Sequence, residues 1–79
     1  MSESFDEILD ARGLFCPEPV MLLHQSIASI DAGQTLKLLA TDPSTTRDVP
    51  RFCEFLGHEL RVQQEQDGEF RFFIRKGGQ

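Results

Sequence analysis

The sequence predicts a two-layer α/β sandwich (class α+β or α/β) in which two helices cover one face of a mixed four-stranded sheet, in the order βαβαββ. Two observations lead to this class. Apolar residues switch between alternating and helical spacing along the chain. An Asp-Gly pair at positions 67 and 68 separates the last two alternating segments, as a hairpin turn does. Right-handed β-helix-β crossovers place both helices on the same sheet face.

The first half of the chain predicts a strand, a turn and a helix. A strand is expected over residues 5–10, and a turn over 11–15, where Gly13 can adopt a positive φ. Helical spacing of apolar residues follows, at Val20, Leu23, Ile27 and Ile30. Gly33 then suits the left-handed position that ends a helix.

The second half predicts a strand over 34–41, a helix, and a hairpin of strands over 58–65 and 69–75. The helix carries an apolar stripe at Val49, Phe52, Cys53 and Leu56. Because Pro50 cannot donate a helical hydrogen bond, we expect only a loose turn over 44–47 and a regular helix from Asp48 to Leu56. With 79 residues the chain predicts one domain over 1–79, with loose ends at 1–4 and 77–79.

Composition narrows the class of function. The net charge of -5 argues against direct binding of nucleic acid, which needs a basic surface. No apolar run is long enough for a transmembrane helix, so no membrane partner is expected. The acidic N-terminus does not resemble a secretory signal. We therefore expect a cytoplasmic protein whose two cysteines are thiols.

Cys16 is the candidate reactive residue. The pattern places it at the N-cap of the first helix, where the helix dipole and unpaired N–H groups favour a thiolate, the nucleophilic form. Pro17 and Pro19 remove two of those N–H donors but stiffen the chain. Glu18 opposes ionisation and Arg12 could offset it. The sequence predicts a moderately activated thiol, and a buried cysteine acting as a small apolar residue is equally compatible with this position.

No second reactive group stands near Cys16 in the sequence. It belongs to no Cys-x-x-Cys pair and to no Ser/His/Asp constellation, which favours a carrier over a self-contained catalyst. Cys53 lies on the apolar stripe and is expected in the core. His24 and His58 have no spacing typical of a structural zinc site, so neither a metal nor a cofactor is expected.

Several segments resemble the TusA (SirA-like) family of sulfur-carrier proteins. They read LDARGL at 9–14, CPEPV at 16–20, DPSTTRDVP at 42–50, GHEL at 57–60 and IRKGG at 74–78. The resemblance implies the βαβαββ fold and a sulfurtransferase that accepts persulfide sulfur on Cys16. It implies a cysteine desulfurase as donor, a downstream sulfur-relay protein as acceptor, and 2-thiolation of the tRNA wobble uridine as the pathway. Relatives serve molybdenum-cofactor sulfuration or sulfur oxidation.

The matched motifs also suggest supporting and partner-binding residues around the cysteine. These are Arg12, Pro17, Glu18, Pro19, Asp42 and Arg47. Phe15 stands where family members can carry a basic residue and adds an apolar rim beside the thiol. A different class of function stays open, a regulatory module that binds partners with the same surface and moves no sulfur.

Overall fold

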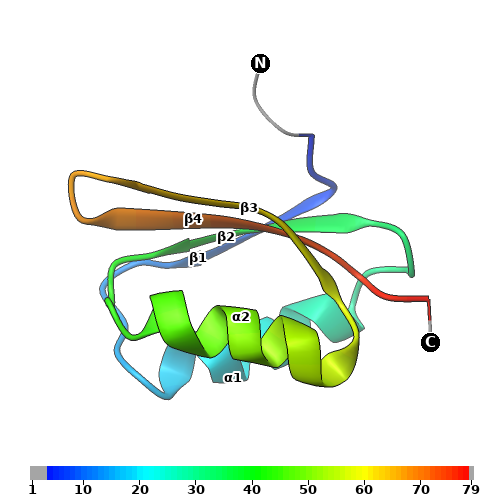
Figure 1. Cartoon of the computed structure of the whole chain (residues 1–79), viewed down its shortest axis with the longest axis horizontal. Helices are drawn as coiled ribbons and strands as arrows, with labels where there is room; N and C mark the ends of the chain where they lie inside the picture. The colour runs from blue at the N-terminus through cyan, green and yellow to red at the C-terminus, as the bar shows by residue number, and fades with distance from the viewer. Residues whose placement is uncertain (1–3, 79) are drawn as a thin grey trace.

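The computed structural model describes residues 4–78 and confirms the predicted order βαβαββ. Both helices lie on one side of a four-stranded sheet, which gives the predicted two layers (Figure 1). The strands are β1 (Glu7–Ala11), β2 (Thr35–Ala40), β3 (Glu59–Gln66) and β4 (Glu69–Arg75), and the helices are α1 (Glu18–Ala28) and α2 (Thr45–Leu56).

The sheet has the order β1-β2-β4-β3, with β1 parallel to β2 and the other two pairs antiparallel. Ala11 at the end of β1 pairs with Ala40 at the end of β2, and Ala40 pairs with Phe70 near the start of β4. The segments that leave β1 and β2 therefore begin at the same end of the strands as the β3–β4 turn. The candidate site lies at this end of the sheet.

The core lies between the sheet and the two helices. Fully buried residues come from every layer, including Leu23 on α1, Val49 on α2, Leu38 on β2 and Phe72 on β4. Because strand side chains alternate between faces, the predicted inward residues of β2 and β4 are confirmed by their burial. They are Leu36, Leu38, Ala40, Phe70, Phe72 and Ile74.

The other sheet face, which no helix covers, also carries an apolar cluster. Phe73 is only 4% exposed there and Leu39 only 9%. Phe5 packs with its ring centroid 6.3 Å from that of Phe73, and the Lys37 ammonium lies 5.1 Å and 5.6 Å from the two centroids. This cation–π arrangement lets a charged residue shield apolar surface from water.

The prediction of a loose turn before α2 is wrong, because the helix runs unbroken from Thr45 through Pro50. The Thr45 N–H and hydroxyl both donate to the Asp42 carbonyl, at 3.0 and 2.6 Å, which starts the helix early. Pro50 removes one helical hydrogen bond, the bond to the carbonyl of Thr46. Thr46 is exposed, so water can satisfy that carbonyl.

The C-terminal segment is held at residues where we predicted a loose end. The Gly77 N–H donates to Nδ1 of His58 at 2.9 Å, and the Lys76 ammonium donates to the Ile30 carbonyl at 2.7 Å. Residues 1–3 and 79, also predicted to be loose, lie outside the described residues. Within 4–78, neither helix has the length and apolarity needed to cross a membrane.

Candidate functional site

Cys16 lies exposed in the segment that joins β1 to α1. The prediction that it caps the helix is wrong by one residue: Pro17 occupies the N-cap, and Glu18 is the first helical residue. The ring of Pro17 disfavours helical backbone angles at the residue before it, so Cys16 stays outside the helix. Because Cys16 is exposed, the alternative of a buried cysteine acting as a small apolar residue is excluded. The second thiol, Cys53, is 2% exposed, and burial raises its pKa to about 11.

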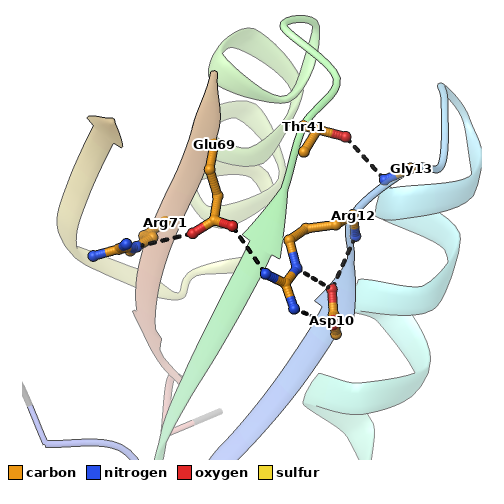
Figure 2. A network of polar contacts seen from close by, with 6 residues as sticks. All are labelled: Asp10, Arg12, Gly13, Thr41, Glu69 and Arg71. Carbon is orange, nitrogen blue, oxygen red and sulfur yellow. Dashed lines mark hydrogen bonds and ion pairs between the residues drawn. The ribbon is translucent and has the colours of Figure 1, made fainter. Parts of the chain in front are cut away.

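Two hydrogen bonds join the cysteine turn, residues 12–17 between β1 and α1, to the segment that follows β2. The Gly13 N–H donates to the Thr41 hydroxyl at 2.9 Å (Figure 2), and the Cys16 N–H donates to Oδ2 of Asp42 at 2.7 Å. The Asp42 carboxylate also accepts the N–H and the hydroxyl of Ser44, at 3.1 and 2.7 Å. These bonds from Ser44 first, and from Cys16 second, lower the pKa of Asp42. Asp42 thus acts as an internal anchor for the cysteine backbone.

A charged pair from α2 stands beside the thiol. Nε of Arg47 donates to Oδ1 of Asp48 at 2.9 Å. This bond is the main cause of the lowered pKa of the Asp48 carboxyl, and the nearby Cys16 side chain acts in the same direction. The thiol therefore has a carboxylate as a neighbour, and that carboxylate is itself held by an arginine.

Cys16 and Pro17 open onto a largely apolar groove of about 430 Å³ between the two helices. Phe55, at its rim, is 88% exposed, which is unusual for a phenylalanine that has neighbouring apolar surface to pack against. Phe15, next to the cysteine in sequence, is 69% exposed. The remaining lining residues are Val20 and His24 from α1, and Asp48, Arg51, Phe52 and Leu56 from α2.

This arrangement can present one nucleophile to a second macromolecule. The thiol is exposed, its backbone is fixed, and the adjoining groove offers apolar surface for a partner. Across residues 4–78, no three His, Cys, Asp or Glu side chains gather closely enough to hold a metal ion.

Comparison with known proteins decides the family. The profile of the family described as Sulfurtransferase TusA matches residues 7–76. The chain belongs to the TusA family. This confirms the resemblance drawn from the motifs, and the matched region includes both the cysteine turn and α2.

Relatives within the TusA family are similar over nearly the whole chain. A sulfur carrier protein TusA of Pseudomonas putida is 63% identical over 71 residues, which is 90% of this chain and 89% of the relative. The corresponding protein of Pseudomonas aeruginosa is 58% identical over 76 residues, 96% of each chain.

A solved structure supports the fold alone. The crystal structure of a SirA-like protein from Desulfitobacterium hafniense superposes with a TM-score of 0.80 at 24% identity, covering 91% of this chain and 99% of that one.

The structure separates the TusA-family motif residues that we singled out. Cys16 and Pro17 line the groove, and Arg47 contacts Asp48 beside it. Pro19 is fully buried and so packs inside the protein, whereas Glu18 is exposed in the first turn of α1. Arg12 is not in the groove. It lies on the uncovered sheet face, paired with Asp10 and Glu69.

Sequence reasoning missed three groove residues, Asp48, Arg51 and Phe55. Asp48, Phe52 and Phe55 recur at i, i+4 and i+7, so they form a second stripe beside the core stripe of α2. The apolar Phe55 on this second stripe was the signal from which the sequence could have predicted the groove. The ring of His24, which also lines the groove, packs edge-on against Phe52, with centroids 4.7 Å apart and planes at 85°.

Proposed function

We propose that the protein carries sulfur as a persulfide on Cys16, accepting it from a cysteine desulfurase and passing it to a downstream relay protein. One observation carries this proposal: Cys16 is exposed and anchored at the mouth of an apolar groove, whereas Cys53 is buried. Membership of the TusA family, whose relatives are named as sulfur carriers, supports the same class of function.

The transfer is a thiol–persulfide exchange. The Cys16 thiolate attacks the terminal sulfur of the donor persulfide, the donor S–S bond breaks, and the donor cysteine leaves as a thiolate. The proton that leaves Cys16 balances the proton that the donor thiolate can take up. No net oxidation occurs, so no external oxidant is needed. Because Cys53 is buried, it is kept from discharging the persulfide as a disulfide.

The groove between α1 and α2 is the proposed docking surface for the donor. Apolar and aromatic residues dominate the buried centres of protein interfaces, and exposed Phe55 has this character. We expect Phe55→Ala to slow sulfur acceptance from the desulfurase while leaving the reaction of Cys16 with a small alkylating reagent unchanged. Equal rates of acceptance in Phe55→Ala and wild type would count against this docking surface.

We place the carrier in the cytoplasm, in the relay that ends in 2-thiolation of the tRNA wobble uridine. The relay protein and not this chain contacts the tRNA, because a net charge of -5 disfavours binding to phosphate. A deletion strain that lost 2-thiouridine, and regained it with wild type but not with Cys16→Ser, would support this pathway. Intact 2-thiouridine would direct attention to molybdenum-cofactor sulfuration or sulfur oxidation.

The carrier function is tested by intact mass. The protein is incubated with a cysteine desulfurase and cysteine, then measured without and with reductant. Wild type and Cys53→Ala are expected to gain one sulfur atom that reductant removes, and Cys16→Ser is expected to gain none. A gain that persists in Cys16→Ser would show that Cys16 is not the sulfur site.

The exposed groove also favours a second candidate, a regulatory module that binds partners without moving sulfur. Phe55 and the groove could serve this role with no thiol chemistry. The two functions separate on Cys16→Ser. Full partner function in this variant would support the module, and complete loss would support the carrier.

A further inference from the structure

We propose that Glu69, at the start of β4, is a positioning residue for Cys16 and acts through Arg12. The proposal rests on the carrier function proposed above, because it concerns how the thiol is presented to a sulfur donor. Glu69 is 53 residues after Cys16 in the sequence and lies outside the groove.

Arg12 occupies the point at which the chain leaves the sheet. β1 ends at Ala11, and the turn that carries Cys16 begins with Arg12. The Arg12 side chain lies on the uncovered sheet face and points across β2 toward β4 (Figure 2). Since β1 and β4 are not neighbours, the side chains of Arg12 and Glu69 together bridge two strand spacings, roughly 10 Å. The long side chain of arginine supplies most of this reach.

All three guanidinium nitrogens of Arg12 are engaged. Nε and Nη2 donate to the two oxygens of Asp10, at 2.9 and 2.7 Å, and Nη1 donates to Oε2 of Glu69 at 3.0 Å. The Arg12 backbone N–H also donates to Asp10, at 3.1 Å. The bidentate pair with Asp10 fixes the plane of the guanidinium, and the bond to Glu69 fixes where it points.

Glu69 is itself held in place. Its second oxygen accepts Nε of Arg71 at 3.2 Å, and its side chain is 24% exposed, compared with 47% for Arg12. The charges alternate along the line Asp10, Arg12, Glu69, Arg71, so each carboxylate faces a guanidinium. The mutual hydrogen bonds lower the pKa of Asp10 to about 2 and also lower the pKa of Glu69.

The bond between Arg12 and Glu69 adds to two anchors that already hold the turn. Thr41 holds the Gly13 N–H and Asp42 holds the Cys16 N–H, and both acceptors come from the segment after β2. Glu69 adds a third attachment, from β4. With it, residues 12–16 are tied both to the segment after β2 and to the start of β4. Without it, the thiol keeps its chemistry but loses part of its fixed orientation.

The first test compares Glu69→Ala with Glu65→Ala. Glu65 is exposed on the same hairpin. Its replacement changes the net charge by the same amount as the replacement of Glu69. In Glu69→Ala we expect amide hydrogen exchange at Gly13 and Cys16 to rise about two- to fivefold, the range expected for losing a partly exposed ion pair. Exchange at these two amides equal to that of wild type would overturn the proposal.

The second test measures sulfur transfer. In Glu69→Ala, kcat/KM for acceptance from the desulfurase should fall about three- to tenfold, because a displaced nucleophile meets the donor less often in a reactive geometry. Alkylation of Cys16 by iodoacetamide should stay at the rate of Glu65→Ala, and the melting temperature should fall by only a few degrees, as expected for one partly exposed ion pair. A fall in transfer no larger than the fall in alkylation would indicate a merely structural role and overturn the proposal.

Two further variants isolate the bond that matters. Arg12→Lys keeps the positive charge but loses the planar guanidinium that binds Asp10 and Glu69 at the same time, so it should reproduce the effect of Glu69→Ala. Arg71→Ala removes only the outer partner of Glu69 and should have a smaller effect than Arg12→Lys. The reverse order of these two effects would assign the role to Arg71 and refute the path through Arg12.

The outcomes also separate this proposal from the carrier function. If wild type takes up no sulfur on Cys16, the carrier function fails, and amide exchange alone decides whether Glu69 positions the turn. If wild type loads normally and Glu69→Ala behaves like Glu65→Ala in both tests, the carrier function stands and the role of Glu69 is refuted.

Discussion

At the scale of single residues, burial decides what each of the two cysteines can do. Cys16 is exposed before α1, while Cys53 sits in the core on the buried side of α2. Desolvation raises the pKa of Cys53 to about 11, so the reactive thiolate is scarce at neutral pH. The same fold thus keeps one thiol available and the other inert.

We expect this difference to appear directly in alkylation. The native protein should take up one equivalent of iodoacetamide, on Cys16, and the unfolded protein two. Peptide mass mapping identifies the modified residue. Rapid modification of Cys53 in the native protein would contradict the burial on which the argument depends.

Two neighbouring glycines near the C-terminus are expected to respond differently to the same substitution. A Cβ at Gly77 would collide with the backbone carbonyl of Gly57, whereas a Cβ at Gly78 would meet no atom of the described chain. Gly77→Ala should therefore lower the midpoint of urea unfolding, and Gly78→Ala should not. Equal midpoints in the two variants would show that the C-terminal segment is free to move away.

At the scale of elements, the residue that precedes β3 is hydrogen-bonded to the C-terminal segment. His58 accepts the Gly77 N–H through Nδ1, so this nitrogen must carry no proton. Burial first, and then the charges of Lys76 and His24, lower the pKa of His58 from its usual 6.5. The unfolded chain consequently binds this proton more readily than the folded protein does.

Stability is therefore expected to depend on pH through His58. Its contribution is fully present above pH 6.5, the unfolded value, and is lost as the pH falls from there through the lower folded pKa. Urea unfolding at about pH 7.5 and about pH 5.5 measures the loss, and His58→Gln should show a smaller loss than wild type. The same loss in both proteins would assign the pH dependence to other groups.

At the scale of the whole molecule, a thin two-layer body leaves each layer dependent on the other. The molecule measures 32 × 30 × 18 Å, and one side of the sheet is covered by α1 and α2. Leu38, on a central strand, is fully buried beneath the helices, whereas Ile8, on the uncovered face of an edge strand, is 48% exposed. The two sheet faces should contribute unequally to stability.

We expect Leu38→Ala to reduce the free energy of unfolding by about 2–5 kcal/mol, because it leaves a cavity in the core between the sheet and the helices. Ile8→Ala should cost less than about 1.5 kcal/mol, since half of its side chain is already in water. Equilibrium urea unfolding gives both values. A larger cost at Ile8 would mean that the uncovered face carries more of the fold than its exposure indicates.

The sequence by itself determined the order of the elements, the inward faces of β2 and β4, and the family, because apolar spacing and turn residues report local backbone geometry directly. It also drew attention to Cys16. It misplaced the start of α2, where Thr45 bonding to Asp42 outweighed the proline, and it named Arg12 and Asp42 as supporting or partner-binding residues without their contacts. Only the tertiary structure assigned the Cys16 N–H to Asp42, 26 residues away, and Arg12 to Glu69, 57 residues away. Such pairs form because the sheet order brings distant strand ends together, and no local pattern in the sequence encodes which side chains then meet.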